Sequence, residues 1–298
     1  MTIQAIIFSK DRPLQLHATL ASFALNATDA AIVQIHVLYK ASNEAYARGY
    51  AQVTEELAGQ LQINWVQESD FKVDLLAVMQ EPRSSSQQRR RLWDQLTLRH
   101  PRLRSDHLLF LVDDNLFIRP FCLQQIADSL DAHPEAIGFS LRVGRNTTSC
   151  YSMQCEQPLP PFETAALGLL FDWSGQVGDF GYPLEVSSSV YRCADLTPLL
   201  RTLPYNNPNR LEQALSAASG LFARRLPSLL CFEQSVAFCA PVNKVQSVLD
   251  NRAGAQEEYS SEALNALFLD GYRVNVSALS EFVPSAAHVE IELPLSRP

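Results

Sequence analysis

The sequence predicts an α/β fold: a mixed, mostly parallel sheet flanked by helices in a single compact domain. Two observations lead to this prediction. Strand-like apolar runs and helical stripes alternate four times before Asp113, which is the pattern of a doubly wound sheet. Residues 108–112 are a run of five apolar residues that stops at Asp113. Such a run is typical of a strand buried on both faces.

The first half of the chain contains four strand–helix alternations. Pro13 suits the first turn of the first helix, where its missing N–H costs nothing, and Leu16, Leu20 and Phe23 form that helix's apolar stripe. The expected strands are residues 3–8, 32–39, 61–67 and 108–112, and the expected helices are 14–25, 44–61, 71–79 and 84–98.

The second half is less regular. Residues 149–183 are rich in Pro, Ser, Gly and aromatic residues and predict a long loop, which in a compact domain is usually functional or mobile. Asn206 to Asn209 form a turn and N-cap signal that places Glu212 in the first turn of a helix. The other expectations are helices at 123–132, 196–203, 210–223, 242–249 and 261–270, strands at 136–143, 185–191, 235–241 and 273–276, a polar loop at 254–261 and an extended tail at 283–298.

Composition narrows the class of protein. The chain has 298 residues and a formal net charge of -8, which argues against a nucleic-acid-binding surface. It has no apolar run of membrane-spanning length, and its first residues enter a strand pattern without the flanks of a signal peptide. The six cysteines include no Cys-x-x-Cys pair, so we expect reduced, structural thiols in a cytoplasmic protein, with no zinc site.

The candidate site begins with Asp113, Asp114 and Asn115, directly after the buried strand. In an open α/β sheet, ligands bind at the carboxyl ends of the strands. Adjacent carboxylates repel, and a bound divalent cation is one reason for such an arrangement, since hard cations take oxygen ligands. A polar turn that caps the next element is the alternative.

Polar clusters also end the other three early strands, at residues 9–12, 40–43 and 68–72. In a parallel sheet all four clusters lie along one edge, which favours a site. Arg12, Lys72 and the run Arg89 to Arg91 can offset the charge of a diphosphate, although the arginine run also suits a solvated helix face. The chain lacks a glycine-rich phosphate loop, which argues against a dinucleotide dehydrogenase or a P-loop NTPase.

Together these residues resemble a glycosyltransferase of the GT-A fold, a Rossmann-related fold. Residues 5–13 resemble its first nucleotide-binding strand and loop, and 37–40 the second. Residues 110–115 resemble the Asp-x-Asp signature, whose carboxylates hold Mn²⁺ or Mg²⁺ on the diphosphate of a sugar nucleotide, with Asn115 in place of the second Asp. Residues 187–192 are similar to the acceptor-side strand of these enzymes. The resemblance implies a nucleotide-sugar-binding half at 1–120 and an acceptor-binding half with a C-terminal tail at 121–298.

The resemblance also implies roles for individual residues. Glu212, with Asp179 as a rival, stands where inverting members carry a catalytic base, and Glu185 is a further rival. If the enzyme retains configuration, no such base is needed. The donor-binding candidates are Ser9, Arg12, Tyr39, Asp70, Lys72 and Asp113. The metal-ligand candidates are Asp113, Asp114, Asn115 and His288.

The implied substrates are a nucleotide-diphosphate sugar as donor and a saccharide or other hydroxyl as acceptor, and peripheral contact with a membrane stays open. Several residues have structural alternatives. Glu212 can simply favour the helix dipole, His288 can be structural, and Trp173, Phe180 and Tyr182 can pack rather than stack on a sugar. A sugar-nucleotide nucleotidyltransferase and a non-catalytic nucleotide- or sugar-binding scaffold remain as other functions.

Overall fold

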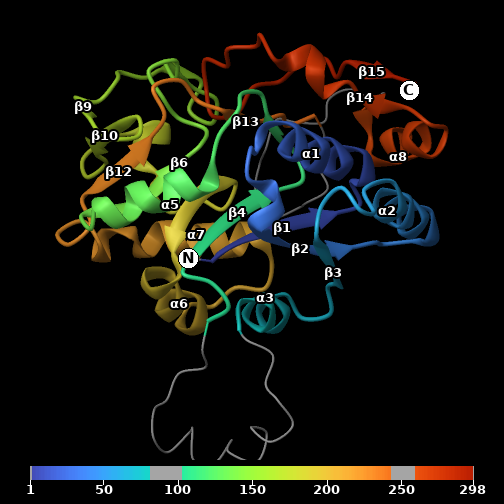
Figure 1. The fold of residues 1–298 in the computed structure, drawn as a ribbon, viewed down its shortest axis with the longest axis horizontal. Helices are drawn as coiled ribbons and strands as arrows, with labels where there is room; N and C mark the ends of the chain where they lie inside the picture. The colour runs from blue at the N-terminus through green and yellow to red at the C-terminus, as the bar shows by residue number, and fades with distance from the viewer. Residues whose placement is uncertain (1, 81–102, 243–258, 298) are drawn as a thin grey trace, which may run out of the picture.

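The computed structural model describes residues 2–80, 103–242 and 259–297. Their central feature is a nine-stranded sheet in the order β3-β2-β1-β4-β11-β6-β12-β10-β9, with helices on both sides (Figure 1). Its strands are β1 (Ile3–Lys10), β2 (Val33–Lys40), β3 (Ile63–Gln67), β4 (His107–Val112), β6 (Ala136–Ser140), β9 (Glu163–Thr164), β10 (Leu169–Asp172), β11 (Ser188–Arg192) and β12 (Ser228–Cys231). The shorter pairs are β5 (Asn115–Phe117) with β13 (Ala237–Cys239), β7 (Ser149–Cys150) with β8 (Cys155–Glu156), and β14 (Arg273–Val274) with β15 (Leu295–Ser296).

The first four strands of this sheet are parallel, as the sequence predicts. β1 lies between β2 and β4, and β3 pairs with β2. The register sets Lys10 opposite Lys40 and Phe8 opposite Val112, so the polar segments that follow these strands meet at one edge. That edge is the one at which an open α/β sheet binds its ligands.

The other half of the sheet is mixed. β11 runs antiparallel to both β4 and β6, β12 runs parallel to β6, and β10 runs antiparallel to β12. The sequence predicts β6 and β11 but neither β10 nor β12, and it assigns a loop to the segment that contains β10. Both strands are only four residues long, too short for periodicity to separate them from loop.

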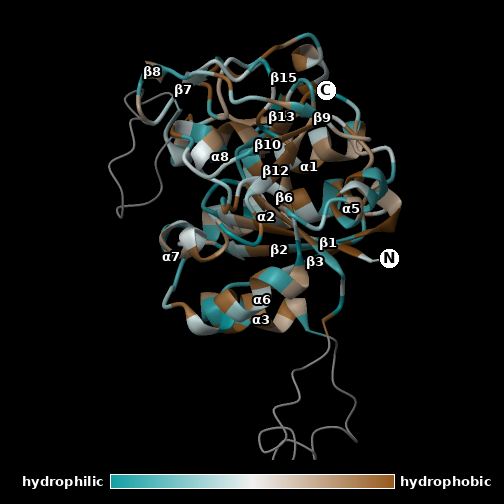
Figure 2. Cartoon of the chain, turned by 90° about the vertical axis from the view of Figure 1, so that its left-hand side faces the viewer, coloured by the Kyte–Doolittle hydropathy of each residue, from teal (hydrophilic) through white to brown (hydrophobic). Residues whose placement is uncertain are grey.

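Helices form a layer on each side of the sheet. α1, α2, α5 and α8 pack into one hydrophobic core cluster, and α3, α6 and α7 pack into a second. Figure 2 shows both hydrophobic and hydrophilic residues along α3 and α6, and the residues that these helices bury include Phe71 and Leu75 of α3 and Leu196 and Leu200 of α6. The helices are α1 (Pro13–Asn26), α2 (Glu44–Glu56), α3 (Phe71–Met79), α5 (Leu123–Ala132), α6 (Cys193–Thr202), α7 (Pro208–Ala218) and α8 (Ser261–Leu269), with short 3₁₀ turns η1 (Ala30–Ile32), η3 (Gly178–Gly181), η4 (Ser219–Leu221) and η6 (Val276–Leu279).

The C-terminal elements attach to the N-terminal half through Arg273. Its Nε donates to Glu56 Oε2 of α2 at 2.7 Å, and its guanidinium lies 3.9 Å from the centre of the Phe268 ring. His17 Nε2 of α1 lies 3.3 Å from the same Glu56 oxygen. This cluster joins α1, α2 and α8, so the tail that carries His288 is fixed to the sheet's first helices.

Some predicted elements differ at their ends or fall outside the described residues. α2 ends at Glu56 rather than 61, because Gly59 takes a φ of 81° in the following turn. Three predicted features lie outside the described residues: the helix at 84–98, the run Arg89 to Arg91 within it, and the helix at 242–249 apart from its first residue. Most of the polar loop at 254–261 lies outside them as well. Among the described helices, none is both long and apolar enough to cross a bilayer.

Gly168 is required for the contact between β10 and β12. Its φ is 75°, and a Cβ at this position would lie 2.2 Å from the carbonyl oxygen of Cys231. We expect Gly168→Ala to lower the free energy of unfolding by about 2–3 kcal/mol, measured by urea denaturation. Gly220→Ala is the matched control, because nothing lies within 4 Å of its added Cβ, and it should change stability by under about 0.5 kcal/mol. Equal stability of both variants would contradict this account.

Candidate functional site

The site is built around an arginine that bridges two adjacent carboxylates. Arg12 Nη1 lies 3.1 Å from Asp113 Oδ1 and 3.2 Å from Asp114 Oδ2. Asp113 also accepts a hydrogen bond from the backbone N–H of Lys10 at 3.2 Å. Arg12 follows β1 and the two aspartates follow β4, so the ion pairs join neighbouring parallel strands at their carboxyl ends.

The turn after β1 brings Arg12 to this position. Asp11 has a φ of 55°, in the left-handed region, and its carboxylate accepts hydrogen bonds from Ser42 N at 2.7 Å and Ser42 Oγ at 2.6 Å. The turn therefore rests on the segment after β2. Pro13 then starts α1 directly, which leaves Arg12 as the N-cap residue.

The two carboxylates are not equivalent. The Asp113 side chain is 6% exposed and that of Asp114 is 16% exposed. The pKa of Asp114 is raised to about 6, mainly by burial and further by the negative charge of Asp113. The positive charge of Arg12 lowers that pKa but does not cancel the rise. One guanidinium shared by two carboxylates leaves a negative charge in excess, and Asp114 is the carboxylate that solvent reaches more easily.

Asn115 has a structural position. Its Oδ1 accepts from Val112 N at 2.8 Å, its Nδ2 donates to Cys239 Sγ at 3.2 Å, and its side chain is fully buried. These bonds close the turn between β4 and β5 and hold it against β13. This departs from the sequence prediction of a metal ligand, because the amide is turned into the protein. The polar-turn alternative describes Asn115, while the two aspartates form the charged site.

Ser9 and Tyr39, two predicted donor-binding residues, lie side by side on β1 and β2. Ser9 Oγ is 2.8 Å from the hydroxyl of Tyr50, which also accepts from Arg12 N at 3.3 Å. The Tyr39 ring packs against the Tyr50 ring with 4.7 Å between centroids. Tyr50, which sequence reasoning missed, therefore links three of the candidates. Its position on α2 gives no local signal, because the contact depends on how α2 packs on the sheet.

Asp70 and Lys72, two further predicted donor-binding residues, have contacts with the protein itself. Asp70 caps α3 by accepting from Val73 N at 3.0 Å. Lys72 Nζ donates to the Leu203 carbonyl at 2.7 Å and lies 4.9 Å from the centre of the Tyr205 ring. These contacts anchor α3 to the segment after α6.

A second buried arginine organises the other side of the site. Arg142 follows β6 and is 2% exposed. Its Nη1 donates to Ser187 Oγ at 3.3 Å, and its Nε lies 3.8 Å from Glu185 Oε2. The Glu185 carboxylate also accepts from the backbone N–H groups of Ser187 and Ser188. Arg142 was not predicted, since a single arginine after a strand carries no recognisable motif.

Glu212 connects the two charged groups. Burial raises its pKa to about 7; Arg142 lowers it, and Glu185 and Asp114 raise it further. Glu212 therefore lies within electrostatic reach of both Arg142 and Asp114. α7 begins at Pro208 and has no acidic residue in its first turn, so Glu212 lies one turn further on than predicted. The helix-dipole alternative loses its basis, because that effect fades beyond the first turn.

The rival carboxylate Asp179 is held by Gln157. Gln157 Nε2 donates to Asp179 Oδ2 at 3.2 Å, and Gln157 Oε1 accepts from Asp179 N at 3.0 Å. Burial is the first cause that raises the pKa of Asp179, and Arg142 lowers it. Glu212 is the carboxylate of this pair with the clearer link to Asp114.

His288 pairs through the backbone with Cys239. Burial first and the charge of Arg142 next lower the pKa of its imidazole to about 3, so the ring is neutral at physiological pH. Two of the three aromatic residues of the long loop, Trp173 and Phe180, belong to a hydrophobic core cluster. Both residues are at most 6% exposed. For these two residues, the packing alternative describes the structure.

The predicted ligands can be compared with what a divalent-cation site requires. Across residues 2–80, 103–242 and 259–297, no group of three or more His, Cys, Asp and Glu side chains could hold a metal. Asp113, Asp114 and His288 are therefore not gathered into a preformed site. Sites for Mg²⁺ on a diphosphate need only one or two carboxylates, with the phosphates supplying other ligands. Asp113 and Asp114, with their excess negative charge, fit that second kind of site.

Comparisons with known proteins point to one class of enzyme. No known protein-family model matches the chain. The chain is 25% identical over 280 residues to the bifunctional glycosyltransferase pgtA of Dictyostelium discoideum, a match that covers 84% of this chain. The chain spans about a third (33%) of the length of that relative.

Two solved structures show partial likeness. TarS of S. aureus, in complex with UDP, has a TM-score of 0.47 at 14% identity and covers 90% of this chain and 71% of its own. The mannosyltransferase PcManGT from Pyrobaculum calidifontis, in complex with GDP-Man and Mn²⁺, has a TM-score of 0.45 at 12% identity, with 93% and 72% covered. At TM-scores below 0.5, these likenesses carry no argument about this chain.

The raised pKa of Glu212 predicts a stability effect. A folded carboxyl with a raised pKa keeps its proton where the unfolded chain has lost it, so the folded state loses stability between pH 4.5 and about 7 and does not recover it above. Glu212→Gln avoids this cost. We expect it to be more stable than the parent protein by on the order of 2–3 kcal/mol at pH 8 and equally stable at pH 4, measured by urea denaturation. A gain that is independent of pH would contradict the assigned burial.

Proposed function

We propose that this protein is a glycosyltransferase of the GT-A type, which moves a sugar from a nucleotide-diphosphate sugar to an acceptor hydroxyl. The observation that carries the proposal is the grouping of Arg12, Asp113 and Asp114 at the carboxyl ends of parallel strands, with Glu212 in electrostatic reach. The similarity to a glycosyltransferase over most of the chain supports it. Residues 1–120 then bind the donor, and 121–298 bind the acceptor.

The donor side needs positive charge. Arg12 is a cation paired with both aspartates, and it is held in place by both. Ser9, Tyr39 and Tyr50 are packed together next to Arg12, and Ser9 and Tyr39 are the residues proposed to contact the nucleoside. Asp113 and Asp114 would hold Mn²⁺ or Mg²⁺ that arrives with the diphosphate. When bound, such a cation offsets the charge that develops on the leaving diphosphate.

Glu212 is the proposed catalytic base for a reaction with inversion. The acceptor oxygen forms a bond to the anomeric carbon, the bond from that carbon to the diphosphate oxygen breaks, and its electron pair stays on the diphosphate. The acceptor's proton passes to the Glu212 carboxylate. A carboxylate with a pKa of about 7 is well matched to this step near neutral pH, because a general base works best when its pKa is near the working pH.

Donor binding gives the first test of the proposal. We expect calorimetry to detect binding of UDP or GDP, and we expect Mn²⁺ to strengthen it, since two carboxylates share one arginine. Asp114→Ala should abolish the strengthening by Mn²⁺ together with donor hydrolysis and transfer. Asp172→Ala, an exposed carboxylate at the far end of the sheet, is the control and should behave as the parent protein. Full activity in Asp114→Ala would remove the proposed donor site.

The role of Glu212 has a separate test. Glu212→Gln should lower kcat by about 10²-fold or more while leaving the affinity for UDP or GDP within about twofold. In the parent protein, kcat should rise with pH through about 7 as Glu212 loses its proton, and this rise should vanish in the variant. An unchanged rate in Glu212→Gln, with a large loss in Asp179→Asn, would transfer the role of base to Asp179.

A further inference from the structure

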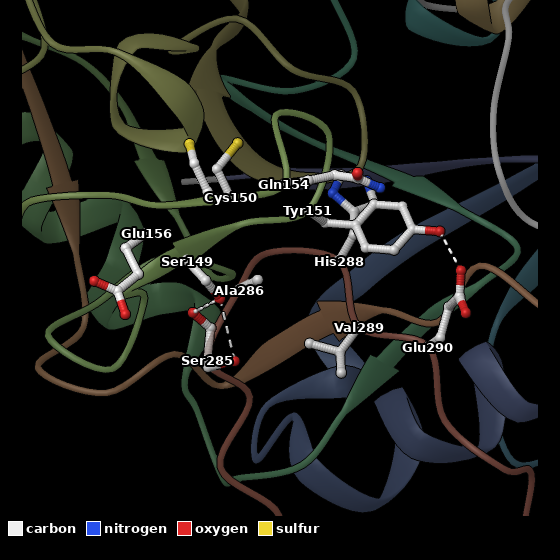
Figure 3. A pocket seen from close by; sticks show the side chains of 11 residues that line it. Ser149, Cys150, Tyr151, Gln154, Glu156, Ser285, Ala286, His288, Val289 and Glu290 are labelled. Carbon is white, nitrogen blue, oxygen red and sulfur yellow. Dashed lines mark hydrogen bonds between the residues drawn. The ribbon is translucent and has the colours of Figure 1, made fainter.

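A cavity of about 550 Å³ lies outside the cluster of Arg12, Asp113 and Asp114. One wall is the hairpin formed by β7 and β8, and the other is the tail segment 285–290 (Figure 3). Two backbone bonds join the walls, from Thr148 N and Ser149 N to the carbonyl of Ser285 at 2.9 and 3.0 Å. The volume lies in the range of small-molecule sites.

The chemistry of the cavity is that of a hydrogen-bonding site with negative charge. Its lining includes the carboxylates of Glu156 and Glu290, and none of the lining residues that the structure describes is a lysine or arginine. Tyr151 donates its hydroxyl to Glu290 Oε1 and so presents its ring at a fixed position (Figure 3). The ring of His288 lies 6.2 Å from that of Tyr151, centre to centre. An aromatic face beside acceptor oxygens suits a ligand with an apolar face and several hydroxyl donors.

The walls of the cavity are linked by hydrogen bonds and backbone pairing to Asp114 and Asp179, which do not line it. His288 lines the cavity and pairs with Cys239, whose sulfur accepts from Asn115. The next residue, Ala240, donates its N–H to the carbonyl of Asp114 at 2.8 Å. On the other wall, Gln157 joins the carbonyl of Ser149 to the carboxylate of Asp179. The cavity is therefore attached on both sides to the proposed reaction site.

We propose that this cavity is the acceptor subsite and that it takes a neutral saccharide. The proposal rests on the proposed function and names the class of acceptor. The sugar ring packs on Tyr151, and its hydroxyls donate to Glu156 and Glu290. An acceptor with a carboxylate or phosphate is disfavoured, because it meets two negative charges, with no cation among the described residues of the lining.

Binding without any donor tests the cavity independently of activity. The probe is a set of methyl hexosides, compared with the matching methyl hexuronates, followed by NMR titration of the protein. We expect the neutral sugars to bind at least tenfold more tightly than the uronates. The double variant Glu156→Gln/Glu290→Gln should reduce that discrimination to about threefold or less. Equal affinity of both probes for the parent protein, or stronger binding of a trilysine peptide than of any hexoside, would overturn the proposal.

Cys155 offers a second measurement of binding. All six cysteines are free, and Cys155 is the exposed one at the cavity. A bound methyl hexoside should slow the reaction of Cys155 with N-ethylmaleimide at least threefold, as followed by mass spectrometry. The reaction at Cys122, which lies outside the cavity lining, should not change. Equal labelling of Cys155 with and without the sugar would count against the cavity.

Transfer kinetics separate this proposal from the proposed function. Tyr151→Ala and Glu290→Gln should lower the ratio of sugar transfer to donor hydrolysis about tenfold, through the KM for the acceptor. Glu292→Gln, an exposed carboxylate two residues further along the tail, is the matched control and should keep the parent ratio. If no sugar nucleotide is hydrolysed, the proposed function is wrong. The NMR titration still decides whether the cavity binds a neutral saccharide. An unchanged ratio in both cavity variants, with donor hydrolysis present, overturns only the acceptor subsite.

Discussion

The structure of the site depends on the bridge from Arg12 to Asp113 and Asp114. Two adjacent carboxylates at a strand end would repel each other and lose hydration on burial, and one guanidinium offsets both effects. Other contacts hold the bridge. Asp11 fixes the turn before Arg12, and Thr19 Oγ1 donates to the Asp113 carbonyl at 2.9 Å. Removing one partner of such a buried group leaves an uncompensated charge, typically at a cost of about 3–5 kcal/mol. The same bridge therefore serves both the fold and the proposed donor site.

Arg142 provides a second fixed cation, and the carboxylates around it differ in environment. Glu185 accepts hydrogen bonds from two backbone N–H groups and lies 3.8 Å from Arg142 Nε, so its carboxylate is held beside that cation. Glu212 has a backbone bond from Val186 but is raised in pKa by burial and by the charges of Glu185 and Asp114. Carboxylates with divergent environments are typical of sites where one group must exchange a proton. This difference is what favours Glu212 over its neighbours as the base.

The sequence predicts the parallel half of the sheet well, because each strand there has a five- to eight-residue pattern and an abrupt polar end, as at Asp113. It fails where elements are short, as at β10 and β12, whose pairing comes from tertiary contact at Gly168. Site residues follow the same rule. Arg12 and Asp113 stand at recognisable strand ends, and the structure brings them together. Asn115 looks like a ligand in sequence, but only the fold shows that its amide faces Val112 and Cys239. Arg142 and Tyr50 act through packing that no local pattern records.

The distribution of charge also separates the binding places of the two proposed substrates. The donor side pairs its carboxylates with Arg12, and it can accept a diphosphate accompanied by a cation. In the part of the chain that the structure describes, the lining of the cavity beside His288 has two carboxylates and no cation, which disfavours an anionic donor there. A neutral saccharide is not repelled by the carboxylates of the cavity. It also gains little binding energy from the buried ion pairs of the donor side. Electrostatics therefore favours a different substrate at each place, before any contact specific to a particular sugar is made: an anion with its cation at Asp113 and Asp114, and a neutral saccharide at the cavity.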